Sequence, residues 1–295
     1  MAPVPEDDAA RPEPSTREGS HRDTAREGRG AVVAPGGPRA ASGLHESLPA
    51  PAAASVRWVG VVATLVAAGA LLVAQHSGYA ATLGVTLVLA LALAWGWPLL
   101  TGSYTPTATT LVLAVSGIAI VLSAVRQDLL WVPAAVAFGI VLSFFGQLVR
   151  RSGREGLVLT LLSSFGGLVV VASATSAVVA ANSDRGQAVA VVALAAVGAA
   201  VVGDLLAGAR VLARVLPLLA LVVAVVAALV AAARVGQVGV LETLAIGAVA
   251  GVGSWSFRRL FALAPATLTA RGQLGAATGS VLAVGAVIHL FSVIT

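Results

Sequence analysis

The chain has 295 residues, of which 58% are hydrophobic and 11% are charged, with a formal net charge of +5. A soluble domain carries about 25% charged residues, so this composition cannot cover a water-facing surface. The arginines stand between apolar runs, where they orient a membrane protein, and they do not indicate nucleic-acid binding. The absence of cysteine excludes disulfides and thiolate metal sites. We therefore expect an all-α, polytopic bundle of transmembrane helices.

Residues 1–55 have a different composition from the rest of the chain. They hold 8 of the 13 prolines, together with eight acidic residues and six arginines, and few large apolar side chains. Such a segment cannot bury enough apolar surface to offset the entropy of ordering. We expect a disordered cytoplasmic tail without a signal peptide, which is either a solvated extension or a docking segment.

Residues 56–295 are predicted to form one transmembrane domain of about nine spans, because apolar runs of about 20 residues recur along it. Turn residues and charges separate these runs. The predicted spans are about 56–73, 81–100, 107–125, 129–149, 157–181, 188–207, 215–233, 240–257 and 274–294.

The distribution of arginine predicts the orientation in the membrane. With a cytoplasmic N-terminus, the cytoplasmic loops and the border of the first span carry nine arginines and the outer loops three, which satisfies the positive-inside rule. The nine are Arg57, Arg150, Arg151, Arg154, Arg210, Arg214, Arg258, Arg259 and Arg271, and the three are Arg126, Arg185 and Arg234. The C-terminus is then extracytoplasmic. Arginine without lysine, with abundant Ala, Gly and Val, indicates a GC-rich bacterial genome, and we predict the bacterial inner (plasma) membrane.

Aromatic residues and glycine pairs supply predictions about anchoring and packing. Aromatic side chains near span ends are expected to anchor the bundle at the membrane–water interface; they are Trp58, Tyr79, Trp97, Tyr104, Trp131 and Trp255. Two glycine pairs at one-turn spacing, Gly247 with Gly251 and Gly275 with Gly279, form strips where helix backbones approach closely. The strips either pack spans together within the chain or form a homodimer face.

Polar side chains at membrane depth are the candidate functional residues, because burying them in lipid is costly. A ligand or ion path is predicted along Asp204, His289, Ser163, Ser164, Ser173, Thr175 and Ser176. Asp204 either serves as a proton or cation site or as a metal ligand, or it pairs with a cytoplasmic arginine such as Arg150 or Arg258. His289 either relays protons or bonds to a neighbouring helix. The sequence shows no pair of histidines with metal-ligand spacing and no catalytic motif, so no catalytic residue, metal or cofactor is predicted.

Arginines on the predicted cytoplasmic face have two possible roles. They either determine topology or hold an anionic lipid headgroup. This set comprises Arg150, Arg151, Arg154, Arg210, Arg214, Arg258 and Arg259.

Two short segments resemble a known family. Gly203-Asp204-Leu205 and Ser256-Phe257-Arg258-Arg259 resemble pieces of the CDP-diacylglycerol synthases, multi-span enzymes that join a nucleotide to phosphatidic acid with divalent metal. The resemblance covers a handful of residues and a similar span count. The family's C-terminal signature contains lysines and metal-binding aspartates, whereas this chain has no lysine and no carboxylate side chain after Glu242. The resemblance implies at most a degenerate relative without that activity.

Three classes of function remain open from the sequence. The first, which the polar residues favour, is a permease for a small solute or ion. The second is a membrane-embedded lipid or envelope enzyme that uses the arginine-rich face. The third is a non-catalytic scaffold or accessory subunit. The expected partners are the lipid bilayer, an anionic lipid at the cytoplasmic face, and a second membrane protein or a second copy of the chain.

Overall fold

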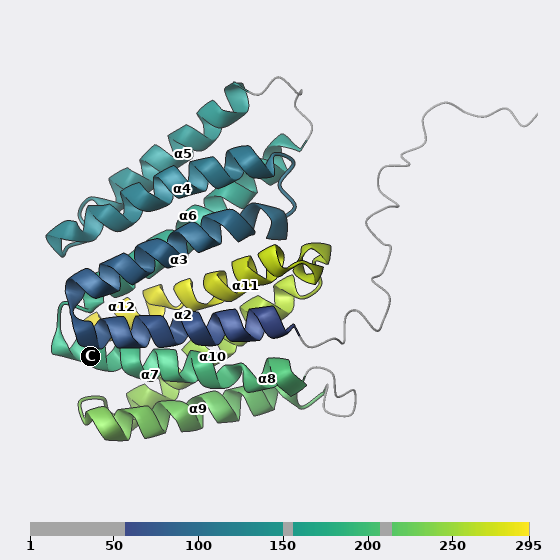
Figure 1. Cartoon of the computed structure of the whole chain (residues 1–295). Coiled ribbons are helices and arrows are strands. Elements are labelled where there is room, and N and C mark those ends of the chain that lie inside the picture. Colours follow the sequence, from purple (N-terminus) through teal and green to yellow (C-terminus); the bar gives the residue numbers. More distant parts are fainter. Residues whose placement is uncertain (1–56, 150–155, 207–213, 295) are drawn as a thin grey trace, which may run out of the picture. The chain divides into compact units, whose positions relative to one another are not determined.

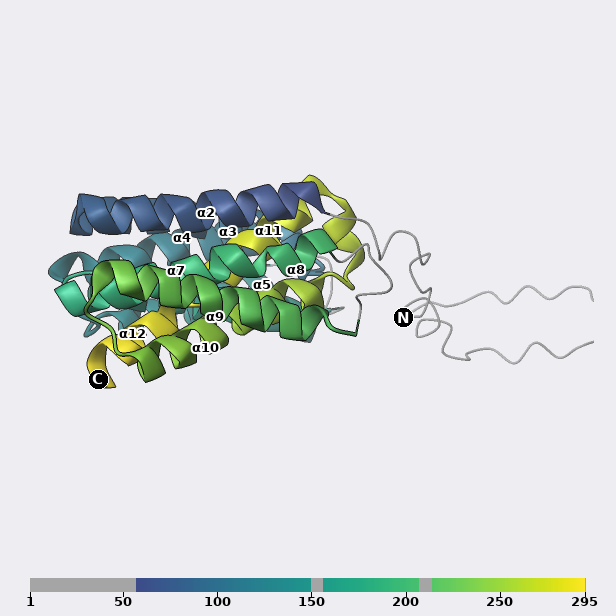
Figure 2. The same cartoon turned by 90° about the horizontal axis from the view of Figure 1, so that it is seen from below.

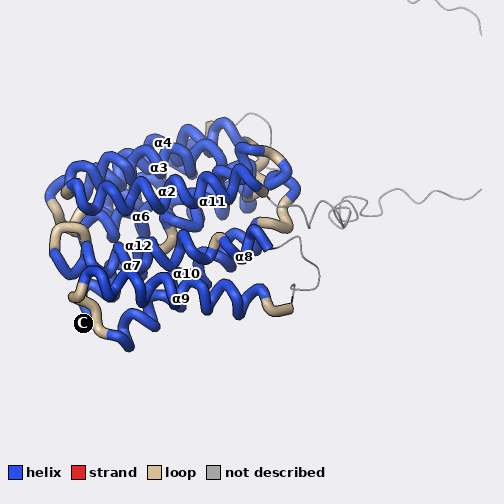
Figure 3. The backbone as a smooth tube through the Cα atoms, turned by 60° about the horizontal axis from the view of Figure 1, so that its bottom comes forward, coloured by secondary structure: helices blue, strands red, loops and turns tan. Residues whose placement is uncertain are grey.

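The computed structural model describes residues 57–149, 156–206 and 214–294. Within these ranges every regular element is a helix (Figure 3), which confirms the predicted all-α class. The predicted tail, 1–55, lies outside the described residues. The elements are α2 Trp58–Ser77, α3 Tyr79–Leu100, α4 Pro106–Ser123, η2 Ala124–Arg126, α5 Val132–Leu148, α6 Leu157–Ala180, α7 Asp184–Ala200, α8 Val202–Leu205, α9 Leu216–Val235, α10 Val240–Phe261, η5 Pro265–Leu268, α11 Ala270–Leu282 and α12 Gly285–Ile294.

Helix length and composition identify an integral membrane protein. Among the described residues, eight helical segments of 20 to 25 residues are apolar enough to cross a bilayer. At about 1.5 Å per residue they measure about 30 Å or more, the thickness of the hydrocarbon core. The α7–α8 pair and the α11–α12 pair each count as one segment, Asp184–Leu205 and Ala270–Ile294. α5 is a shorter apolar helix of 17 residues. Each predicted span overlaps one of these segments.

Successive apolar segments run in opposite directions, so their ends gather at two ends of the bundle (Figure 1). We call one the basic end; it contains the start of α2, the ends of α8 and α10, and the start of α11. Its described arginines are Arg57, Arg214, Arg258, Arg259 and Arg271. We call the other the distal end; it contains the ends of α2, α9 and α12, and the arginines Arg126, Arg185 and Arg234. Arg150, Arg151, Arg154 and Arg210 lie outside the described residues.

Small side chains let α9 pack closely against its neighbours. Among the described spans, the α7–α8 segment is the most enclosed: 61% of its most apolar stretch is buried inside the bundle, against 28% for α9. Figure 2 shows α9 at the front of the bundle beside α10. α9 buries one residue per turn, and this row consists of Leu216, Ala220, Ala224, Ala228 and Ala232.

The two predicted glycine strips each pack against a neighbouring helix of the chain. A Cβ atom on Gly251 would lie 2.2 Å from Cβ of Ala224, and one on Gly247 would lie 2.7 Å from Cβ of Ala228. This strip therefore brings α10 against α9. A Cβ on Gly275 would lie 2.7 Å from the backbone of Gly96, so the second strip brings α11 against α3. Gly279 of that strip faces the ring of Phe257 on α10 and the side chain of Leu93 on α3.

Two of the predicted interface anchors are buried, so that interpretation is wrong for them. Trp97 is 4% exposed and Trp255 is 8% exposed. The ring centroid of Trp97 lies 6.0 Å from that of Phe257 and 5.5 Å from that of Phe261. Its Nε1–H donates to the backbone oxygen of Ser163 at 2.7 Å. Position near a span end does not determine which side of the helix a side chain occupies. Trp58, Tyr104 and Trp131 are more than half exposed, as an anchor requires.

The last predicted span, 274–294, is interrupted between α11 and α12. Ser173 of α6 inserts its hydroxyl there: Oγ donates to the carbonyl oxygen of Ala283 at 2.9 Å and accepts the amide of Ala286 at 2.8 Å. A side chain that enters the hydrogen-bond ladder in this way breaks the helix. Gly285 permits the approach, because a Cβ at this position would lie 2.1 Å from the carbonyl oxygen of Ser173.

Candidate functional site

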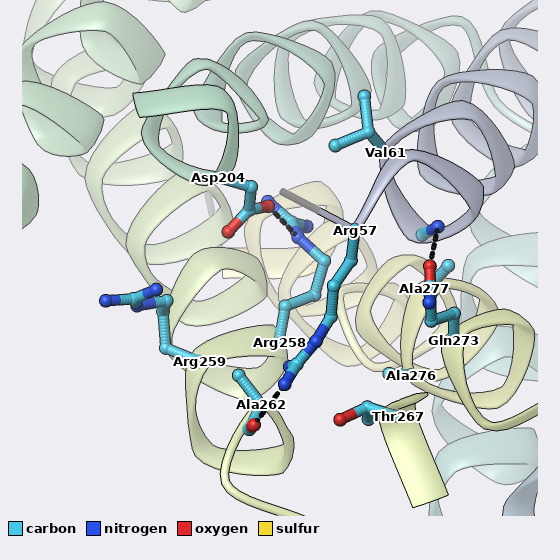
Figure 4. A pocket seen from close by; sticks show the side chains of 11 residues that line it. Arg57, Val61, Asp204, Arg258, Arg259, Ala262, Thr267, Gln273, Ala276 and Ala277 are labelled. Atoms are coloured by element: carbon cyan, nitrogen blue, oxygen red, sulfur yellow. Dashed lines mark hydrogen bonds and ion pairs between the residues drawn. The ribbon is translucent and has the colours of Figure 1, made fainter. Parts of the chain in front are cut away.

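An arginine-lined cavity lies at the basic end, where α2, α8, α10, η5 and α11 meet (Figure 4). It has a volume of about 60 Å³, measured for the centres of water-sized molecules, and it is open on one side. Because one water molecule needs about 10–15 Å³ on this measure, the cavity has room for a small anion or several waters. Its charged lining residues are Arg57, Asp204, Arg258 and Arg259. We call it the arginine cavity.

An ion pair between α8 and α10 forms one wall of the arginine cavity. Nε of Arg258, in the last turn of α10, donates to Oδ2 of Asp204 at 2.6 Å. Nη1 of the same arginine donates to the hydroxyls of Ser254, at 2.7 Å, and Ser280, at 3.2 Å. Arg258 is 8% exposed, and its Nη2 is buried without a hydrogen-bond partner. Both N–H bonds of Nη2 therefore lack an acceptor.

Arg57 and Arg259 add positive charge to the same cavity. Nη2 of Arg57 donates to the carbonyl oxygen of Ala262 at 2.7 Å, whereas its Nε is buried without a partner. Arg259 lies over the ring of Trp255, with Cζ 5.8 Å from the centroid. Burial and, after it, the charge of Arg259 lower the pKa of the Arg57 guanidinium, while Asp204 acts in the opposite direction.

The charges that line the cavity do not cancel. Three guanidinium groups and one carboxylate line it, which sums to +2. Positive groups held close together repel one another, and an anion among them removes this repulsion. The arrangement therefore favours a negatively charged ligand.

Gln273 contributes an uncharged part of the cavity wall. Its Oε1 accepts the backbone amide of Gly60 at 3.0 Å, so α11 is joined to the first turn of α2. No sequence pattern marks Gln273 as a site residue. Arg57 is predicted from the sequence only as a determinant of topology, because it stands directly before the first span. Arg57 and Gln273 are held at the cavity by hydrogen bonds to residues far away in the sequence, Ala262 and Gly60 respectively.

The predicted ligand path is not brought together around Asp204. None of the hydroxyl residues of α6, nor His289, is among the described residues that line the arginine cavity. Ser164 and Thr175 donate to carbonyl oxygens within their own helix. Ser176 donates to the carbonyl oxygen of Ser173. The hydroxyl of Ser163 lies 2.5 Å from that of Thr101.

Three other residues named from the sequence lie apart from the arginine cavity. Nδ1 of His289 is buried without a partner on α12. Arg214 is exposed at the basic end and does not line the cavity. Glu242 of α10 pairs with Arg185 at the distal end, at 2.9 Å.

Metal-binding groups are not clustered in the part of the chain that the structure describes, where no three His, Asp or Glu side chains stand together. Asp204 is surrounded by guanidinium groups instead. No family model, curated protein or solved structure matches the chain. The resemblance of 203–205 and 256–259 to CDP-diacylglycerol synthases thus rests on those residues alone, two of which form the ion pair described above. The chain is an integral membrane bundle of helices with an arginine-lined cavity at one end.

Proposed function

We propose that this membrane protein binds an anionic, phosphate-bearing headgroup in the arginine cavity. One observation carries the proposal: three arginines and one aspartate line the same half-open cavity, where N–H groups of Arg57 and Arg258 are buried without acceptors. Guanidinium groups bind phosphate oxygens through paired, charge-assisted hydrogen bonds. A buried donor without an acceptor is unfavourable, so the cavity gains from an oxygen-rich anion.

The position of the cavity favours a lipid as the source of this headgroup. Arg57 directly precedes Trp58, which starts the first span and is 64% exposed. Exposed tryptophans at span ends lie at the level of lipid headgroups. A headgroup could therefore enter while its acyl chains remain beside the bundle. Inorganic phosphate from the aqueous phase is the other source of the same chemistry.

The predicted orientation places this face toward the cytoplasm. The described part of the basic end carries five arginines, against three at the distal end. We propose that the anion is bound at the cytoplasmic face of a bacterial inner membrane. In that leaflet anionic lipids are concentrated and basic groups attract them.

The binding proposal is tested with the purified full chain in detergent. Thermal unfolding is measured with inorganic phosphate, with an anionic phospholipid and with a zwitterionic phospholipid. We expect the anionic lipid to raise the melting temperature and the zwitterionic lipid to have a smaller effect. If the cavity recognises only the phosphate group and not the acyl chains, inorganic phosphate should also raise the melting temperature, at a higher concentration than the anionic lipid.

Two double variants with the same change of net charge locate the binding site. Arg57→Gln with Arg259→Gln alters the arginine cavity, whereas Arg126→Gln with Arg234→Gln alters the distal end. Each lost charge-assisted hydrogen bond costs about 1.5–3 kcal/mol, so the first variant should weaken binding at least about tenfold. The distal variant should retain the affinity of the wild type. Equal weakening in both variants would show non-specific attraction and refute the proposed site.

A small-solute permease is the second function we propose, because the α11–α12 span is discontinuous. Discontinuous helices in transporters expose backbone groups that bind substrates or ions. Ser173, one of the predicted path residues, lies at this interruption. Uptake of radioactive sodium by proteoliposomes provides a first test. Uptake no faster than in protein-free liposomes would refute permeation of that ion.

A further inference from the structure

A second, smaller cavity lies where α2, α3, α6 and α7 surround the α11–α12 interruption. Its volume is about 20 Å³ on the same measure as the arginine cavity, enough for one water molecule or one ion of similar size. Its polar lining side chains are Gln75, Thr82 and Thr86. Thr86 stands seven residues after the start of α3 at Tyr79, about 10 Å from the distal end. Thr86 therefore lies inside the membrane-spanning segment Tyr79–Leu100.

Gln75 provides a buried oxygen that lacks a donor. Its residue is 3% exposed, and its Oε1 is buried with no hydrogen-bond partner. An unpaired carbonyl oxygen in an apolar surrounding is costly. A cation or a water molecule in the adjoining cavity would satisfy it.

The other polar features of the cavity favour a cation over an anion. The hydroxyl of Thr82 donates to the carbonyl oxygen of Gly78, which leaves its lone pairs available as acceptors. Val281 and Leu282 are the last residues of α11, and a helix C-terminus carries partial negative charge. The opposing effect of the α12 N-terminus is reduced, because Ser173 accepts the amide of Ala286. None of the described lining residues is positively charged.

A polar hollow at the distal end shares one lining residue with this cavity. It has a volume of about 130 Å³ and is lined by Gln75, His76, Asp184, Gln187 and Gln237, among others. Gln75 belongs to both linings. Asp184 is exposed, and its carboxylate attracts cations to the hollow. The hollow and the inner cavity therefore adjoin at Gln75.

We propose that the inner cavity binds one monovalent cation of about the size of sodium, which enters from the distal end past Gln75. Oε1 of Gln75 and the hydroxyl oxygens of Thr82 and Thr86 are its side-chain ligands. Divalent cations prefer carboxylate ligands, and the described residues around the inner cavity include none. This site is at the opposite end of the bundle from the arginine cavity and does not depend on anion binding.

The experiment is thermal unfolding of the purified full chain in sodium chloride and in choline chloride at equal ionic strength. We expect sodium to raise the melting temperature saturably, by about 2–4 °C, and choline to have no such effect. Equilibrium binding of radioactive sodium should saturate at one ion per chain.

Three variants test whether the effect arises at this cavity. Gln75→Leu and the nearly isosteric Thr86→Val should each abolish the sodium-specific increase and the bound radioactive ion. Gln147→Leu removes another buried, unpaired Oε1, which lines neither the inner cavity nor the outer hollow, and should retain both. If Gln75→Leu does not fold, Thr86→Val decides the question. Equal effects of sodium and choline on the wild type would overturn the proposal and leave water as the occupant.

Discussion

The substitution Asp204→Asn separates the structural role of the ion pair from its effect on ligand binding. It keeps the shape of the side chain and removes the charge that faces Arg258, whose Nε lies 2.6 Å from the carboxylate. The Arg258 side chain is 7% exposed and cannot regain full hydration. The variant therefore holds a buried guanidinium without a counter-ion.

The loss of stability follows from the burial of the two partners. Removing one member of a buried ion pair costs about 3–5 kcal/mol. The side chain of Asp204 is 18% exposed at the edge of a cavity, so we expect the lower limit, about 3 kcal/mol. At about 2–4 °C per kcal/mol, the melting temperature should fall by about 6–12 °C.

Anion binding should change in the opposite direction. The substitution raises the charge that lines the arginine cavity from +2 to +3, because one of its four charged side chains is neutralised. Asp204→Asn should therefore be less stable without ligand, and anionic lipid should stabilise it more than the wild type. Thermal unfolding with and without lipid measures both effects.

A double-mutant cycle with Arg258→Gln checks the coupling. The double variant should lose less stability than the sum of the two single variants, because neither charge is left unpaired. Additive losses would show that the pair does not act as a unit. If Asp204→Asn bound anionic lipid more weakly than the wild type, the electrostatic reasoning would be refuted.

Three further predictions follow from packing and topology. Gly251→Val should lower the free energy of unfolding by about 1–3 kcal/mol, because a Cβ at this position would lie 2.2 Å from Cβ of Ala224. Gly253→Ala on the same helix should leave stability unchanged, because its Cβ meets no atom within 4 Å. Equal melting temperatures of the two variants would contradict this prediction. Ser173→Ala should lower the free energy of unfolding by about 1–3 kcal/mol, because it removes both hydrogen bonds at the α11–α12 interruption. Ser164→Ala, which loses only a hydrogen bond within its own helix, is the control, and calorimetry measures the difference between the two variants. A reporter active only in the cytoplasm should be silent at the C-terminus, and a signal there would disprove the predicted orientation.

The membrane class and the approximate positions of the helices follow from the amino-acid sequence alone. Both depend on local composition, because a run of about 20 apolar residues spans the bilayer as a helix wherever it occurs. The sequence also identified Asp204 as the acid in the sixth span that needs an explanation. The sequence leaves Arg150 and Arg258 as possible partners of Asp204, and in the structure the partner is Arg258.

Which side of each helix is buried, and which residues meet, depends on how the helices pack in three dimensions. Ala, Val and Leu occur on all sides of these helices, so periodicity did not show that Trp97 faces inward. Arg57 reaches Ala262 across 205 positions, and Ser173 reaches Ala286 across 113, separations at which sequence gives no pairing rule. The arginine cavity and the α11–α12 interruption both arise from such contacts. Helix formation is local, whereas a binding site depends on how the helices pack.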